Sequence, residues 1–188
     1  MSSSPSYWYW KNVLNLKQIK KINKFIINNY DNLEEEELKA KDNNNIIKKN
    51  TETFIIKFEK IKKLIFNLIE NCYAVNKYHF GYDLWEYKNL NCNYNLYKSS
   101  NQANYDWHID ACKDSYSDIK LTVLINLSEK KFEGGDFYLE QTNLTKVNEL
   151  KEIGSMIMFK SFIRHMVTPI TSGERKNLAL FLTGPNFQ

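Results

Sequence analysis

The spacing of His108, Asp110, His165 and Arg175 constrains this chain more than any other feature of the sequence. Side chains at positions i and i+2 of a β-strand point to the same side, so His108 and Asp110 can reach one metal ion together. A remote third ligand, His165, must then come from another strand. Two imidazoles and one carboxylate occupy one face of an Fe(II) ion and leave the opposite face open for a cosubstrate and O₂. The chain has three histidines, and two of them fall in this pattern.

Arg175 follows His165 by ten residues, with a turn signal at Ser172-Gly173 between them. This length allows the chain to finish one strand, turn and return alongside, which puts Arg175 at the inner end of the same pocket. A guanidinium presents a flat fork that matches a carboxylate with two parallel hydrogen bonds. A 2-oxoglutarate molecule that chelates the iron through its 1-carboxylate and 2-keto oxygens would direct its far carboxylate to this fork.

Composition indicates one globular domain over residues 1–188, because 43% of the residues are hydrophobic and 14% aromatic. The net charge of +4 is mild, and the lysines are spread along the sequence. A nucleic-acid groove would need a denser basic patch with interleaved aromatics, so we do not expect a nucleic-acid partner.

The cellular setting is predicted from what the sequence lacks. No apolar run approaches the ~20 residues that span a bilayer, so no membrane partner is expected. The three cysteines, an odd number without metal-type spacing, read as free thiols in a reducing cytosol, which also keeps iron ferrous. A cytoplasmic protein is therefore expected, and the abundance of Asn, Lys and Ile is typical of an AT-rich bacterial or viral genome.

The hydrophobic pattern changes character near Tyr78. Before it, helical periodicity predicts helices from Asn15 to about Asn29 and over 58–76, with a first strand at 7–13 and a polar surface excursion over 31–50. After it, short alternating segments predict strands at 81–87, 93–97, 105–110, 119–127, 135–140, 155–159, 165–169 and 176–183. The chain thus reads as helical support (1–76) followed by a jelly-roll core (77–188): a mainly β, α+β fold with its N-terminal helices packed on one sheet.

The same half of the chain resembles a known family. The segments that carry the resemblance are YDWHID (105–110), LTVLINL (121–127), EGGDF (133–137), GSMIMF (154–159), HMVTP (165–169) and SGER (172–175). Together they look like the catalytic core of the 2-oxoglutarate/Fe(II) dioxygenases, and they are most similar to the prolyl and lysyl hydroxylase branch, including its PKHD-type members. The resemblance covers about 76–185, whereas the helical first third matches only in outline.

This resemblance implies a double-stranded β-helix fold and a set of site residues. Iron would be held by His108, Asp110 and His165, which are also the catalytic residues, and Arg175 would bind the tail of 2-oxoglutarate. The implied cofactors are Fe(II), 2-oxoglutarate as cosubstrate and O₂, with ascorbate as a supporting reductant.

Three further residues are candidate contacts of 2-oxoglutarate. In this branch a tyrosine on the strand before the H-x-D motif often touches the cosubstrate, and Tyr97 is the first candidate. Tyr105 is the second, because its odd parity relative to His108 turns it away from the metal unless the strand has a bulge. The third is Asn126, which stands near a position where the family often has a tyrosine.

The departures from the family pattern concern the substrate. The connection 98–104 lacks the glycine that is common there, and Phe181 replaces a common tryptophan. Arg175 stands in place of a lysine, and an arginine here also fits lysyl-type members. This position therefore does not distinguish a prolyl from a lysyl target. Trp107 and Arg164 adjoin ligands but face away by alternation, and we read both as structural.

The expected function is hydroxylation of a C–H bond in a prolyl residue of a peptide or protein that lies in a groove under the 98–104 and 111–118 loops. Three enzymatic alternatives remain: a lysyl hydroxylase, a nucleobase-repair dioxygenase and a small-molecule dioxygenase. A fourth is a non-catalytic jelly-roll module that binds metal.

Overall fold

The structure, a computed structural model, describes residues 5–31, 49–86, 91–110 and 118–186. Within these ranges the chain forms two α-helices, α1 (Leu16–Asn29) and α2 (Phe58–Val75). The strands are β1 (Tyr7–Trp10), β2 (Glu52–Lys57), β3 (Asn91–Lys98), β4 (Tyr105–His108), β5 (Asp118–Asn126), β6 (Glu133–Gly134), β7 (Phe137–Glu140), β8 (Leu144–Lys146), β9 (Met156–Lys160), β10 (Arg164–Val167), β11 (Ile170–Ser172) and β12 (Glu174–Gly184).

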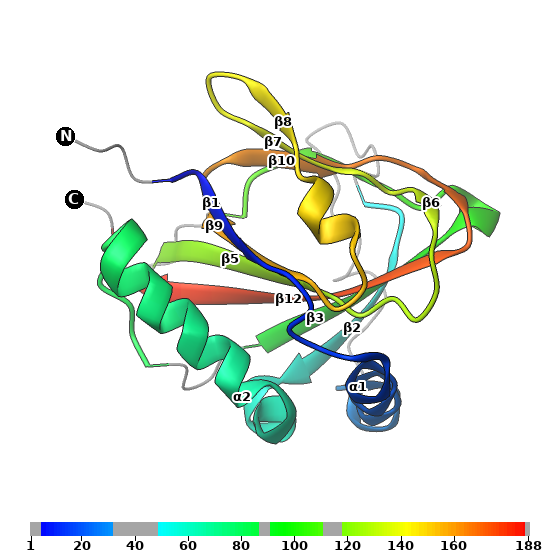
Figure 1. Ribbon diagram of the computed structural model, residues 1–188, viewed down its shortest axis with the longest axis horizontal. Helices are drawn as coiled ribbons and strands as arrows, with labels where there is room; N and C mark the ends of the chain where they lie inside the picture. The colour runs from blue at the N-terminus through cyan, green and yellow to red at the C-terminus, as the bar shows by residue number, and fades with distance from the viewer. Residues whose placement is uncertain (1–4, 32–48, 87–90, 111–117, 187–188) are drawn as a thin grey trace.

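Two antiparallel sheets lie face to face (Figure 1). The major sheet has the order β1-β9-β5-β12-β3-β2, and the minor sheet has the order β4-β10-β7-β8. A further pair joins β11, which lies between β10 and β12 along the chain, to β6, which precedes β7. Buried side chains of both sheets form a shared inner core that includes Leu124, Phe137, Leu139, Ile157 and Val167. This arrangement is the predicted jelly roll.

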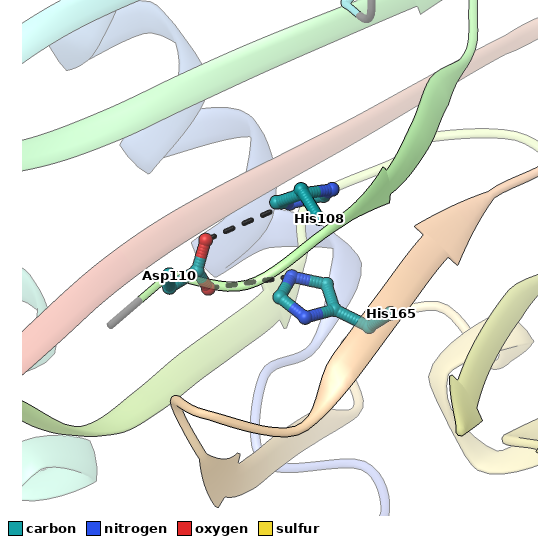
Figure 2. A group of neighbouring side chains, drawn as sticks. All are labelled: His108, Asp110 and His165. Atoms are coloured by element: carbon teal, nitrogen blue, oxygen red, sulfur yellow. Dashed lines mark ion pairs between the residues drawn. The ribbon is translucent and has the colours of Figure 1, made fainter. Parts of the chain in front are cut away.

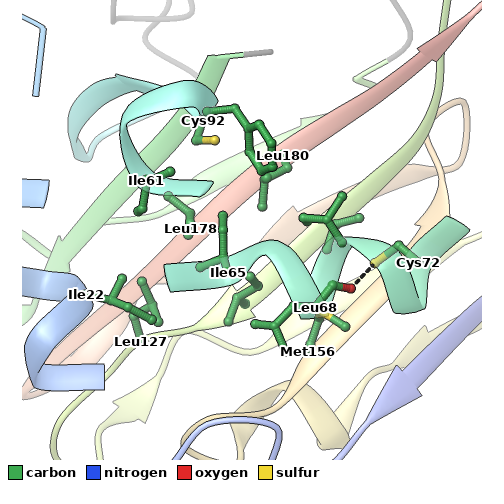
Figure 3. Close-up of a cluster of buried hydrophobic side chains, with 14 of the residues drawn as sticks. Ile22, Ile61, Ile65, Leu68, Cys72, Cys92, Leu127, Met156, Leu178 and Leu180 are labelled. Carbon is green, nitrogen blue, oxygen red and sulfur yellow. Dashed lines mark hydrogen bonds between the residues drawn. The ribbon is translucent and has the colours of Figure 1, made fainter. Parts of the chain in front are cut away.

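Both helices cover the outer face of the major sheet (Figure 1). Strand residues of opposite parity to the inner core, such as Val123 and Leu178, pack against Ile22 of α1 and Ile65 of α2 (Figure 3). The major sheet is therefore buried on both faces, which explains the nearly continuous apolar run of β5. The predicted placement of the helices on one sheet is confirmed.

The first helix begins as the sequence predicts. The side chain of Asn15 accepts a hydrogen bond from the backbone N–H of Gln18, and the side chain of Gln18 accepts one from the backbone N–H of Asn15. This reciprocal pair is a capping box, which satisfies two of the N–H groups that a helix start leaves free.

None of the helices in the described part of the chain is long and apolar enough to cross a bilayer.

Several element boundaries differ from those expected. Strands β2, β6, β8 and β11 were not predicted, and 81–86 is extended without forming the expected strand. The second helix ends at Val75, and a five-residue π-helical turn (Asn76–Phe80) follows it. Because β1 and β2 join the major sheet at its two edges, residues 1–76 supply strands as well as helical support. The expected polar excursion lies mostly outside the described residues, but its end, Lys49, is buried.

The connection between β3 and β4 is formed without glycine. A 3₁₀ turn over Ser99–Asn101 leads to Gln102, whose φ of 48° is left-handed. This conformation is uncommon for a residue with a side chain. It brings the chain back so that Ala103 and Lys98 are joined by a backbone hydrogen bond, and β4 then starts beside the inner core.

Gly134 is a position where the fold requires the absence of a side chain. Its φ is +67°, and a Cβ added there would lie 2.2 Å from the carbonyl oxygen of Pro169. Gly81 has a similar φ of +73° but open space around it, so it provides a matched control. We expect Gly81→Ala to cost about 1–2 kcal/mol of folding stability for the left-handed backbone. Gly134→Ala should cost about 1–3 kcal/mol more because of the clash. Urea unfolding measures both, and equal losses in the two variants would contradict this account.

Candidate metal centre

The two histidines and the aspartate of the sequence motif converge on one point (Figure 2). His108 ends β4, Asp110 follows it, and His165 lies opposite His108 on the neighbouring strand β10. Nε2 of His108 lies 3.6 Å from Asp110 Oδ1, and Nε2 of His165 lies 3.3 Å from Asp110 Oδ2. One potential ligand atom of each residue lies within 4.8 Å of the other two. The three groups are thus close enough to share one ion.

Backbone carbonyls fix which ring nitrogen of each histidine faces the others. Nδ1 of His108 is 2.6 Å from the carbonyl oxygen of Asp106, and Nδ1 of His165 is 2.9 Å from that of Ile163. A ring nitrogen facing a carbonyl must be the protonated donor, so Nε2 of each neutral ring carries a lone pair. Burial, with a smaller effect from His165, lowers the pKa of His108 to about 4, so this ring is neutral at neutral pH.

The carboxylate of Asp110 is held in its ionised form. Burial by itself raises its pKa, but interactions with His165, His108 and the hydroxyl of Thr122 together hold the pKa below its ordinary value. The hydroxyl of Thr122 donates to Asp110 Oδ2 at 2.8 Å, and the backbone N–H of Asp110 donates to the carbonyl of Ser161. When both rings are neutral, two Nε2 lone pairs and one carboxylate point to the centre of the triad, which is the donor set that a divalent cation requires. These residues fit a divalent metal.

Thr122 provides a test of how the carboxylate is oriented. Its side chain is fully buried on β5, so Thr122→Val keeps the shape and removes only the hydroxyl. Because outer hydrogen bonds to a metal ligand are worth about 10–100-fold in metal affinity, we expect roughly tenfold weaker binding. Titration with Mn²⁺ followed by electron paramagnetic resonance measures it. Thr53→Val is the control, since its buried hydroxyl bonds to Asn95 and to no triad residue. Equal affinities in both variants would show that Thr122 does not orient the carboxylate.

Arg175 is a buried cation whose terminal nitrogens are unsatisfied. It lies on β12 opposite Tyr97 of β3, with Cζ 5.1 Å from the ring centroid, and its side chain is 1% exposed. Neither Nη1 nor Nη2 has a hydrogen-bond partner in the described part of the chain. An unpaired buried charge is strongly unfavourable, so this guanidinium requires an anion. The far carboxylate of a bound dicarboxylic acid meets that requirement.

Tyr97 links Arg175 to the metal cavity. Its ring lines the cavity that contains the triad, whereas Arg175 lines a neighbouring pocket. Phe137 belongs to the walls of both. Burial raises the pKa of Tyr97 to about 12, although the charge of Arg175 works in the opposite direction. The phenol is therefore neutral and can donate a hydrogen bond to the same anion.

Tyr105 also lines the triad cavity, and a strand irregularity explains why. The pairing of β4 with β10 shifts register between His165↔His108 and Val167↔Tyr105, which is a bulge of one residue. The bulge reverses the parity argument that turned Tyr105 away. Its ring stacks on the ring of His108, with centroids 3.5 Å apart and an angle of 13° between the planes. Tyr105 therefore supports a metal ligand from within the cavity.

Asn126 is not among the residues that line the cavity. Its side-chain amide donates to the carbonyls of Leu150 and Glu152, and its Oδ1 accepts from the N–H of Ser128. These contacts hold the turn before β9, and they use the groups that a cosubstrate would need. The structure thus brings Tyr97, Tyr105 and the triad together but leaves Asn126 apart.

The neighbours of the ligands in sequence are structural, as expected. The guanidinium of Arg164 lies 5.0 Å from the ring of Trp107 and pairs with Glu140 at 2.7 Å.

The third histidine, His79, stacks on Trp8, away from the triad. Phe181 lines the cavity.

Sequence reasoning missed four polar residues of the cavity wall: Lys49, Asn93, Asn95 and Asn177. Three of them carried a usable signal, because the asparagines share the parity of Tyr97 and Arg175 on their strands. Lys49 carried none, since it precedes a strand that the pattern did not reveal.

Comparison with known proteins identifies this arrangement. Residues 92–183 match the family model of the 2OG-Fe(II) oxygenase superfamily. The chain carries a domain of this superfamily. The 2OG-Fe(II) oxygenases are oxidoreductases that use Fe(II), 2-oxoglutarate and O₂, and the triad of this oxygenase domain fits the iron. No curated protein sequence matches the chain.

Solved structures share the fold of the oxygenase domain over nearly the whole chain. A prolyl-4-hydroxylase from Pseudomonas putida is 16% identical with a TM-score of 0.66, covering 96% of this chain and 94% of its own. A viral collagen prolyl hydroxylase from Paramecium bursaria Chlorella virus-1, in complex with 2OG, is 15% identical with a TM-score of 0.66 and coverages of 96% and 97%. A prolyl hydroxylase from Trichoplax adhaerens, in complex with a hypoxia inducible factor peptide fragment, is 15% identical with a TM-score of 0.62 and coverages of 94% and 83%. At these identities the likeness shows the fold alone.

Proposed function

We propose that this protein is a 2-oxoglutarate- and Fe(II)-dependent dioxygenase that hydroxylates a prolyl residue in a peptide or protein. One observation carries the chemistry: three metal-binding groups converge beside a buried guanidinium whose terminal nitrogens have no partner among the described residues. A single bound molecule with a chelating end and a far carboxylate accounts for both. In this proposal residues 1–188 act as one catalytic domain.

The roles of the side chains follow from their positions. His108, Asp110 and His165 would hold iron, which when bound with 2-oxoglutarate supplies the oxidising power to hydroxylate an unactivated C–H bond. Arg175 pairs with the far carboxylate, and Tyr97 donates a hydrogen bond to it, so the cosubstrate has one orientation. The ring of Tyr105 holds His108 in place by stacking. The side chains of the triad are only 3–13% exposed, which limits the access of bulk water to the reacting groups.

The prolyl target is supported by the solved structures that share the fold and by the lining of the cavity. All three of the similar structures described above are named as prolyl hydroxylases, and one of them was solved with a bound peptide fragment. The lining of the cavity includes the aromatic rings of Tyr105 and Phe181, which suit an apolar pyrrolidine ring. A peptide would lie across the connection 98–104; most of the other expected roof, 111–118, falls outside the described residues.

The test is a turnover assay with a mass readout. The protein is incubated with Fe(II), ascorbate, 2-oxoglutarate and peptides that carry either proline or lysine. We expect succinate formation coupled to the gain of one oxygen atom on proline, and inhibition by excess Zn²⁺, which has no redox chemistry. Oxygen gain on lysine instead would replace the prolyl assignment by a lysyl one. No succinate with any peptide would refute the proposed activity.

A further inference from the structure

Lys49 is a buried cation beside the metal triad that the proposed mechanism does not use. Its side chain lines the triad cavity and is only 7% exposed. Its backbone pairs with Tyr105, and its Nζ lies 5.2 Å from the centroid of that ring. The positions of Lys49, Thr51 and Thr53 share one parity, so Lys49 extends the inner face of β2 toward the triad. It thus reaches the cavity where the segment before β2 meets β4.

The ammonium of Lys49 lacks a counter-ion within the described part of the chain. No ion pair or hydrogen bond joins its Nζ to another described residue, and the ring of Tyr105 is its nearest favourable contact. A cation–π contact recovers only part of the cost of burying a charge. Burial lowers the pKa of Lys49 to about 8, with Asp110 acting in the opposite direction, so the group is still protonated at neutral pH.

Charge balance at the loaded site shows which ligand Lys49 needs. The two positive charges of a divalent metal and the one of Arg175 are matched by Asp110 and the two carboxylates of 2-oxoglutarate. With the histidines neutral, these groups sum to zero, and Lys49 adds one uncompensated positive charge in the same cavity. Because unpaired charges in a low-dielectric cavity are costly, the remaining ligand of this cavity should bring one negative charge.

The cavity wall near Lys49 is polar in a second place. Asn177 is 3% exposed, lines the cavity, and its Oδ1 has no hydrogen-bond partner among the described residues. Asn95, opposite it on β3, is bonded to Thr53. 2-Oxoglutarate has no N–H or O–H to offer a carbonyl oxygen, so the unsatisfied Oδ1 of Asn177 awaits a donor from elsewhere. A peptide N–H beside the target residue is such a donor.

We propose that Lys49 anchors the substrate through a carboxylate next to the residue that is hydroxylated. This inference rests on the proposed function and narrows its substrate class to peptides with an acidic group beside the target proline. The carboxylate can be the side chain of a flanking Asp or Glu, or the α-carboxylate of a C-terminal proline. Both sources present the same group, and Lys49 is a specificity-determining residue rather than a catalytic one.

The test compares matched peptides and matched lysines. Peptides with one proline carry either Glu or Gln beside it, and a second pair ends in proline with a free or an amidated C-terminus. Affinities are measured by calorimetry on protein loaded with Zn²⁺ and 2-oxoglutarate, so that no turnover is needed, and kcat/KM is measured separately with Fe(II). The variants are Lys49→Met, Lys49→Arg and the exposed control Lys62→Met, whose ammonium pairs only with Glu59 among the described residues.

We expect wild-type protein and Lys62→Met to bind one acidic peptide roughly tenfold or more tightly than its neutral partner. Lys49→Met should lose this preference, and Lys49→Arg should keep part of it. The pair that shows the preference identifies the source of the carboxylate. Equal affinity of the wild type for acidic and neutral peptides in both pairs would overturn the inference, as would a variant whose only defect is a raised KM for 2-oxoglutarate. Lys49-dependent binding without any succinate formation would support the subsite and refute the proposed reaction.

Discussion

Replacing His165 by alanine is expected to abolish iron-dependent turnover of 2-oxoglutarate, with a loss of about 1,000-fold or more. The imidazole is 3% exposed, and its Nε2 faces Asp110 at 3.3 Å, so no other described side chain can take its place. A divalent metal with two remaining protein ligands is held much more weakly, because each ligand contributes strongly to affinity. Succinate formation measured at saturating Fe(II), together with Mn²⁺ affinity, tests both consequences.

The third histidine of the chain provides the control for this experiment. His79 stacks on Trp8 with ring centroids 4.1 Å apart and takes no part in the triad. His79→Ala should therefore keep metal affinity and turnover close to the wild type, apart from a modest loss of stability. Retention of metal binding and turnover in His165→Ala would remove His165 from the proposed ligand set.

The metal triad could be predicted because its chemistry imposes a local rule. His108 and Asp110 must share a side of the chain, and alternation along a strand provides this at a spacing of two residues. The structure places both beside His165, which follows Asp110 by 55 residues in the sequence. In the sheet, His165 lies directly opposite His108. The jelly roll could be predicted for a similar reason, since short alternating segments admit few other layered arrangements.

Features that depend on pairing between distant strands could not be read from the pattern. The bulge that turns Tyr105 into the cavity exists only through the register of β4 against β10. Residues Glu52–Lys57 form strand β2 because they pair with the edge of β3. The segment just before this strand carries Lys49 into the cavity wall. Asn126 was assigned because the family often has a tyrosine near its position, but the carbonyl of Leu150 that occupies its amide comes from a 3₁₀ turn distant in the sequence.

Replacing Arg175 by methionine is expected to raise the KM for 2-oxoglutarate by about 100-fold while leaving metal affinity unchanged. Losing one partner of a buried charge pair costs about 2–5 kcal/mol, and each 1.4 kcal/mol is a factor of ten. Methionine fills a similar volume without charge. Because the guanidinium of the free protein is buried and its terminal nitrogens are unpaired in the described structure, its removal also relieves a desolvation cost. The variant should thus be at least as stable as the wild type without cosubstrate, and 2-oxoglutarate should raise the Tm of the wild type only.

Arg164 is the matched control, because it is the only other arginine of the chain. Its guanidinium lies on the surface against Trp107 and Glu140, outside both pockets. Arg164→Met should keep the KM for 2-oxoglutarate and lose a little stability, which is the opposite pattern to Arg175→Met. An unchanged KM in Arg175→Met would mean that the far carboxylate is bound elsewhere. Lys49, the buried cation that lines the triad cavity itself, would then be the first residue to substitute, and the charge balance from which its substrate role is inferred would no longer hold.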